Sequence, residues 1–124
     1  MKLIVVIDDS GFHRRLARHE LAHSSGIVIP ETVAEVGWLD PQNIGLLILD
    51  RHMGASWKQA AERLLARITP DCEVVEWTAG TQFDDLERWP SAICAVSKID
   101  SSGELEKLVN RWIRTGTVRQ PVTA

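Results

Sequence analysis

Short apolar runs alternate with amphipathic segments along the chain. Residues 3–7, 45–49 and 92–96 are almost continuously apolar, which is typical of strands buried on both faces of a parallel sheet. Residues 74–78 and 27–29 share this character over shorter or less regular stretches. The pattern therefore predicts five strands.

The segments between these runs show the spacing of amphipathic helices. Apolar residues recur at i, i+3, i+4, i+7 and i+8 over residues 57–68 and 105–113, so each of these helices has one apolar face. Ser10 provides an N-cap and Gly26 a C-terminal stop for a first helix, and Pro90 ends a later one. The shorter helices predicted in this way cover residues 12–23, 33–39 and 83–89.

Strands that alternate with helices predict βα units joined by right-handed crossovers. We expect an α/β fold with a doubly wound, five-stranded parallel sheet, flavodoxin-like, in which the βα unit is repeated five times. The 124 residues are enough for one domain, which we assign to residues 1–114. Residues 115–124 are polar, contain Pro121 and are predicted to form a flexible tail or linker.

Composition and charge restrict the partners of the chain. Hydrophobic residues make up 44% and charged residues 25%, as in soluble globular proteins, and the net charge of -3 offers no basic surface for direct nucleic-acid or membrane binding. The apolar run 3–7 is too short for a signal peptide or a membrane span. Cys72 and Cys94 lie far apart in the sequence, which favours reduced thiols and a cytoplasmic protein.

Chemically active residues follow the predicted strands. Asp8 and Asp9 end the first strand, Asp50 the third, Thr78 the fourth and Lys98 the fifth. Functional residues of such sheets gather at the carboxyl ends of the strands. Three carboxylates at one edge repel one another unless a cation lies among them, and a set of oxygen ligands suits Mg²⁺. A lysine and a hydroxyl beside that metal can hold phosphoryl oxygens, and one carboxylate can act as the nucleophile.

The same residues carry a resemblance to a known family. In order and spacing, VVIDDS, LLILDRHMG, WTAG and AVSKID resemble the characteristic segments of response-regulator receiver domains of two-component signalling systems, over nearly the whole chain. The resemblance implies that Asp50 accepts a phosphoryl group. It also implies that Asp9 ligates Mg²⁺ with Asp50 and the backbone carbonyl of His52, that Asp8 assists through water, and that two further residues contact the phosphoryl oxygens, Thr78 and Lys98.

The function implied by this resemblance is a phosphorylation-switched signalling module. The donor would be a histidine kinase or a phosphotransfer protein, and the output would pass to an unknown downstream protein or a fused output domain. Such a module is not a metabolic enzyme, because it catalyses only its own phosphoryl transfer and dephosphorylation.

Some positions depart from the family pattern. Ile99 stands where a proline usually follows the lysine, Gly54 replaces another common proline, and Ala95 replaces an aromatic residue. These departures favour the alternative of a phosphorylation-independent pseudo-receiver that acts as a docking adaptor. Glu76 stands in the fourth strand where the family prefers an apolar residue, and the sequence leaves open whether it faces an edge or pairs with a charge.

Two other classes of enzyme are less compatible with the sequence. Phosphatases of the haloacid-dehalogenase type have the motif D-x-D, in which one residue separates the two aspartates. Here Asp8 and Asp9 are adjacent. Residues 19–23, HELAH, fit the zinc-protease pattern H-E-x-x-H. Arg15 lies one turn before the first histidine, however, and a third ligand would have to come from Glu31 or Glu35. A histidine near a helix C-terminus is stabilised by the helix dipole without any metal.

Overall fold

A five-stranded sheet forms the centre of the protein. The computed structural model describes residues 2–79, 88–99 and 103–120. All pairings between neighbouring strands are parallel, in the order β2-β1-β3-β4-β5. This arrangement confirms the predicted fold class. The strands are β1 (Leu3–Ile7), β2 (Ile27–Val28), β3 (Ile44–Asp50), β4 (Glu73–Thr78) and β5 (Cys94–Ser97).

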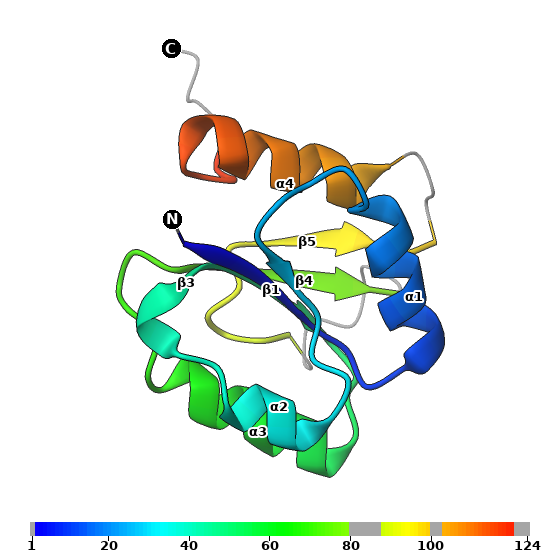
Figure 1. Cartoon of the computed structure of the whole chain (residues 1–124), viewed down its shortest axis with the longest axis vertical. Helices are drawn as coiled ribbons and strands as arrows, with labels where there is room; N and C mark the ends of the chain where they lie inside the picture. The colour runs from blue at the N-terminus through cyan, green and yellow to red at the C-terminus, as the bar shows by residue number, and fades with distance from the viewer. Residues whose placement is uncertain (1, 80–87, 100–102, 121–124) are drawn as a thin grey trace.

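Helices cover both faces of this sheet. In Figure 1, α1 and α4 lie on one side of the sheet, and α2 and α3 lie together on the other. The chain is therefore doubly wound, as expected from the alternation of strands and helices. The helical elements are α1 (Gly11–Glu20), α2 (Val33–Gly37), the 3-10 turn η1 (Pro41–Asn43), α3 (Ala55–Leu65) and α4 (Glu104–Thr115).

The first helix has the predicted N-cap, begins at Gly11, one residue before the predicted range, and ends earlier than predicted. The side chain of Ser10 accepts a hydrogen bond from the backbone N–H of His13 at 3.3 Å, which caps the helix. The helix ends at Glu20, not at residue 23, with Leu21 as its C-cap. The buried side chain of Leu21 packs in the core while the chain turns back toward β2. Gly26, with φ of 75°, lies in that return and does not end the helix.

The segment before β5 also differs from expectation. Of the helix predicted at residues 83–89, residues 83–87 lie outside the described part of the chain, and Arg88 and Trp89 are not helical. β5 begins at Cys94, two residues later than predicted. A turn closed by the hydrogen bond from Ala92 N to Trp89 O, at 3.1 Å, occupies the start of the apolar run instead.

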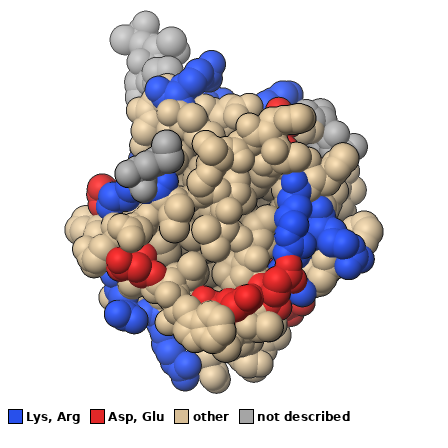
Figure 2. Space-filling view, in the orientation of Figure 1, with Lys and Arg blue, Asp and Glu red and all other residues tan. Residues whose placement is uncertain are grey.

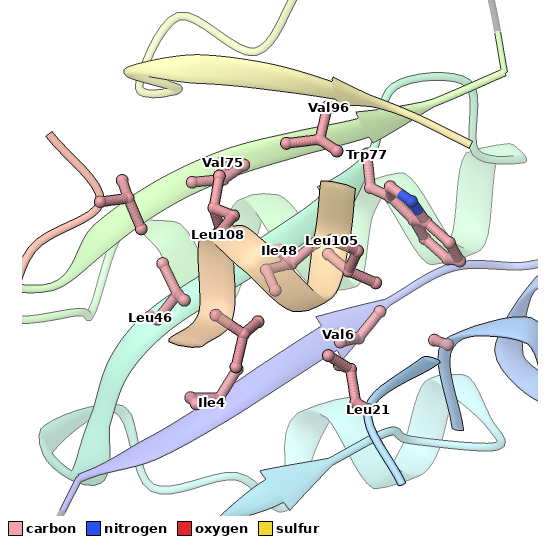
Figure 3. Close-up of a cluster of buried hydrophobic side chains, with 13 residues drawn as sticks. Ile4, Val6, Leu21, Leu46, Ile48, Val75, Trp77, Val96, Leu105 and Leu108 are labelled. Carbon is pink, nitrogen blue, oxygen red and sulfur yellow. The ribbon is translucent and has the colours of Figure 1, made fainter. Parts of the chain in front are cut away.

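Side-chain alternation along the strands divides the core into two clusters. On the face covered by α1 and α4, Ile4 and Val6 of β1 pack with Leu105 and Leu108, as Figure 3 shows. On the other face, residues between these in β1 pack with α2 and α3. All seven residues of β3 are buried. Burial on both faces explains why the strands appear as continuous apolar runs.

The outer surface carries charges of both signs. In Figure 2, acidic and basic side chains alternate around the edge of the visible face, and no continuous basic patch covers it. None of the helices in the described ranges is long and apolar enough to cross a membrane. The two cysteines, Cys72 and Cys94, are both free thiols.

The described part of the predicted tail is attached to the sheet. Thr115 is the last residue of α4, and Val118 is buried. Glu73 accepts hydrogen bonds from Thr117 Oγ1 at 2.6 Å and from the N–H of Val118 at 2.7 Å. The structure thus joins these residues to the domain, where the sequence predicted a flexible segment from residue 115 onward.

Replacing Gly45 with alanine tests how tightly α4 packs on the sheet. A Cβ at this position would collide with the ring of Trp112 and lie 2.9 Å from Lys2 Cβ, so Gly45→Ala should lower the free energy of unfolding by about 1–3 kcal/mol. Gly37→Ala is the control, because no atom lies within 4 Å of its added Cβ. Urea denaturation measures both variants. A Gly45→Ala variant as stable as wild type would contradict this packing.

Candidate functional site

Three carboxylates meet at the carboxyl edge of the sheet. β1 and β3 pair in parallel with Ile7 opposite Leu49, so Asp8 and Asp50, the next residues in each strand direction, reach the same edge. Carboxylate oxygens of Asp8, Asp9 and Asp50 lie within 4.8 Å of one another. The register of two buried strands thus creates the acidic cluster.

Asp8 lies at the bottom of this cluster and is fully buried. Its Oδ1 accepts a hydrogen bond from the N–H of Ser10 at 2.9 Å, and its Oδ2 contacts Lys98 Nζ at 2.5 Å. Burial raises the pKa of the Asp8 carboxyl, while the hydrogen bond and the charge of Lys98 act in the opposite direction. The carboxylate form of Asp8 therefore depends on a nearby cation.

Lys98 is the protein's own cation in this cluster. Its side chain is only 3% exposed, and its Nζ also donates a hydrogen bond to Asp50 Oδ1 at 2.9 Å. The same nitrogen lies 3.2 Å from His13 Nδ1 and 5.0 Å from the centre of the Trp77 ring. One ammonium group thus bridges two carboxylates of different strands, with an aromatic face beside it.

Asp9 connects the cluster to the loop that follows β3. Its Oδ2 accepts a hydrogen bond from the N–H of Gly54 at 2.8 Å. Gly54 is the N-cap of α3, so this bond fixes the start of that helix relative to the end of β1. Asp9 is partly exposed, which places its carboxylate at the open side of the cluster.

The donor set fits a hard divalent cation. Within the described ranges, these three aspartates are the one group of three or more acidic, histidine or cysteine side chains that could hold a metal ion. All of their ligand atoms are oxygens, the ligands that Mg²⁺ prefers in proteins. The three carboxylates can therefore hold such a cation, next to the ammonium group of Lys98 that contacts Asp8 and Asp50.

The comparisons with known proteins give a consistent family. No protein-family model matches the sequence, and no curated protein matches it. Among solved structures, the response regulator protein TrrA from Thermotoga maritima, in complex with Mg²⁺-BeF, is 30% identical, with a TM-score of 0.66 over 90% of this chain and 98% of that one. The chain belongs to the response-regulator receiver family.

Two more distant structures share the fold of this receiver. The Mn²⁺-bound form of response regulator Rcp1 is 18% identical, with a TM-score of 0.60 over the full length of both chains. A response regulator receiver protein from Burkholderia phymatum is 19% identical, with a TM-score of 0.65 over 98% of this chain and all of that one. Receiver domains are signalling modules, which agrees with the class of function expected from the sequence.

The structure brings together most of the residues singled out in the sequence. Asp8, Asp9, Asp50 and Lys98 form one connected cluster. Thr78 is buried at the end of β4, and its backbone oxygen accepts a hydrogen bond from the N–H of Lys98 at 2.9 Å. The side chain of His52 is exposed, and the role of its carbonyl as a metal ligand stays a prediction.

His13 is part of the site but was not recognised in the sequence. Besides its contact with Lys98, its Nδ1 lies 3.8 Å from Asp8 Oδ1. His13 is the third residue of α1, and only the N-cap Ser10 separates this helix from the acidic pair. A polar residue in the first turn of such a helix lies near the end of the preceding strand, so its position carried a usable signal.

In a second, buried cluster of charges, Glu76 was identified from the sequence but its partner was not. Glu76 has no exposed surface, and its carboxylate pairs with the buried guanidinium of Arg51. The sequence left its partner open. An acidic residue in a buried strand requires a cation, but the partner could be identified only from the structure, because Arg51 is 25 residues away in the chain.

The structure does not place the two HELAH histidines on one helix, and it shows no cis bond after Lys98. α1 ends at Glu20, so His19 is helical whereas His23 follows the helix, and the two histidines do not share a continuous helix. The described residues contain no cis peptide bond, so Ile99 follows Lys98 through a trans bond. Ala95 is exposed on β5, the edge strand.

Replacing Asp8 with asparagine tests the electrostatic cost of the cluster. Burial raises the pKa of Asp8, so the folded wild type loses stability as the pH rises through that pKa. Asp8→Asn should therefore raise the free energy of unfolding at pH 7 in the absence of divalent cations. The gain should shrink toward pH 4. Urea denaturation across this range measures it, and a variant less stable than wild type at pH 7 would contradict the prediction.

Proposed function

We propose that this receiver accepts a phosphoryl group on Asp50 from a histidine kinase or a phosphotransfer protein and so acts as a switch in a two-component phosphorelay. One observation carries the proposal: Asp50 ends the central strand, with Asp8 and Asp9 close enough to share a cation and with Lys98 Nζ at 2.9 Å from its Oδ1. The 30% identity to TrrA, whose structure is a complex with Mg²⁺-BeF, supports the same assignment.

Mg²⁺ is the cofactor that we assign to this site. Asp8, Asp9, Asp50 and the backbone carbonyl of His52 would hold it, Asp8 through water. When bound, Mg²⁺ supplies positive charge to the phosphoryl oxygens and the attacking carboxylate.

The residues of the chain supply the remaining chemistry. A carboxylate oxygen of Asp50 attacks phosphorus, a new P–O bond forms, and the P–N bond to the donor histidine breaks with its electron pair returning to the imidazole. Lys98 then donates to a phosphoryl oxygen instead of to Asp8, and Thr78 provides a neutral hydroxyl donor. The reaction leaves a changed charge at one strand end, which a downstream protein or a fused output domain reads.

Labelling with a small phosphodonor tests the assignment of Asp50. Incubation with acetyl phosphate and Mg²⁺ should add one phosphoryl mass to wild type and none to Asp50→Asn, because the amide is not a nucleophile for this transfer. Intact-mass spectrometry measures the product. Asp71→Asn is the matched control, because Asp71 is exposed and lies at the opposite end of β4, and it should be labelled like wild type.

Two outcomes of this experiment would count against the proposal. Labelling of Asp50→Asn as strong as that of wild type would show that another residue is the acceptor. A wild type that takes no label would instead favour the phosphorylation-independent docking adaptor.

Removing Asp9 tests the proposed metal site. Asp9→Ala should weaken Mg²⁺ binding by at least about 10-fold, because a ligand at the open side of the cluster is lost. The fold should remain intact, since Asp9 is partly exposed. Calorimetric titration measures the affinity, and Asp71→Ala serves as the control. An unchanged Mg²⁺ affinity in Asp9→Ala would contradict the proposed ligand set.

A further inference from the structure

A buried ion pair lies directly behind the candidate phosphorylation site. Glu76 is completely buried in β4, and the side chain of Arg51 is 4% exposed. Arg51 Nε lies 3.2 Å from Glu76 Oε2, and Arg51 Nη2 lies 3.0 Å from Glu76 Oε1, so the pair is bidentate. Burying two charges costs several kcal/mol per ion, and a well-packed apolar pair is often as stable. Stability alone therefore does not explain this pair.

Trp89 connects the ion pair to Asp50. Its backbone N–H donates to Glu76 Oε2 at 2.9 Å, and its indole Nε1–H donates to the backbone oxygen of Asp50 at 2.9 Å. Arg51 is the next residue after Asp50 in the chain. These contacts form a closed circuit from the Asp50 carbonyl through Trp89, Glu76 and Arg51 back to Asp50. We refer to Arg51, Glu76 and Trp89 as the Glu76 circuit.

The Glu76 circuit reaches the surface on the side of α3. A cavity of about 540 Å³ is lined by Arg51 and Trp89 of the circuit, by Arg88 and Ser91 beside Trp89, and by α3 residues that include Lys58. Arg88 also approaches Glu76, with Nε 3.6 Å from Oε1. Trp89, which donates to the Asp50 backbone oxygen, and Arg51, which follows Asp50 in the chain, therefore also form part of the wall of a surface pocket.

We infer that the Glu76 circuit transmits the state of the Asp50 carboxylate to the pocket between α3 and residues 88–91. This inference rests on the proposed phosphorylation of Asp50. Phosphorylation adds negative charge beside Lys98 and changes the contacts of the Asp50 side chain. Because the Asp50 carbonyl is held by Trp89, a shift of this residue must stretch the indole hydrogen bond or move Trp89 with it. The bidentate pair of Arg51 and Glu76 is held rigidly by two hydrogen bonds and does not deform gradually. A shift of Asp50 is therefore passed on to Trp89 and Arg51, which line the pocket.

Beryllofluoride with Mg²⁺, a phosphoryl mimic, tests the inference by NMR. In wild type it should shift the amide signals of Gly54, beside the site, and of Ser91, at the pocket. Trp89→Phe removes the indole N–H and keeps an aromatic ring. In this variant the Gly54 shift should persist, with beryllofluoride affinity within about threefold of wild type, while the Ser91 shift falls below half of its wild-type size.

Two further variants make the test specific. Trp38→Phe is the matched control, because Trp38 is 77% exposed and lies outside the circuit, and it should behave as wild type. The double variant Arg51→Met with Glu76→Leu removes the ion pair without leaving a lone buried charge. It should also lose the Ser91 shift and keep the Gly54 shift, and it decides the question if Trp89→Phe does not fold.

The possible outcomes separate the inference from the proposed function. A Ser91 shift of wild-type size in Trp89→Phe, or in the double variant, would overturn the inference and leave the phosphorylation site intact. A wild type whose Gly54 signal does not respond to beryllofluoride and Mg²⁺ would contradict the proposed function, and the inference would fail with it.

Discussion

The close approach of three carboxylates at the end of a buried sheet is the constraint on which the site depends. Asp8 and Asp50 reach the same edge because β1 and β3 are adjacent and in register. Both residues are buried, so water screens the charge of neither carboxylate effectively. Lys98 supplies the neutralising charge from the far edge of the sheet. A buried ammonium between two carboxylates ties β5 to β1 and β3, so the same contact fixes the geometry of the strand ends and holds Asp50, the acceptor that we propose.

The strands and the acidic cluster were accessible from sequence because they follow from burial and register. β3 is buried along its whole length and therefore appears as an apolar run ending in Asp50. Boundaries set by tertiary contacts were less accessible. Residues 92–96 are apolar, yet the strand starts at Cys94 because a turn at Trp89 takes up the first part of the run. α1 stops at Glu20 because Leu21 packs into the core while the chain reverses, which helical periodicity cannot show.

The partner of Glu76 was beyond the reach of the sequence for a different reason. A buried acid demands a cation, but several arginines were available, and only the packed structure selects Arg51. The hydrogen bonds of Trp89 were equally hidden, since no periodic pattern specifies which backbone oxygen an indole N–H contacts. Long-range polar contacts of single residues are the features that local propensity and alternation leave undetermined.

Alternation along β4 places the two charge clusters on opposite faces of the sheet. Trp77 packs on the face of α1 and α4, beside Lys98, whereas Trp89, which binds Glu76, belongs to the cluster on the face of α2 and α3. Asp50 is opposite Trp77 in the sheet register and belongs to both arrangements, since its side chain contacts Lys98 and its backbone oxygen contacts Trp89. The proposed phosphorylation of Asp50 would alter the first set of contacts directly. Because the side chain and the carbonyl belong to one residue that is held from both sides, the second set of contacts would be strained unless it moved as well. The proposed modification on one face of the sheet would thereby be coupled to the other face.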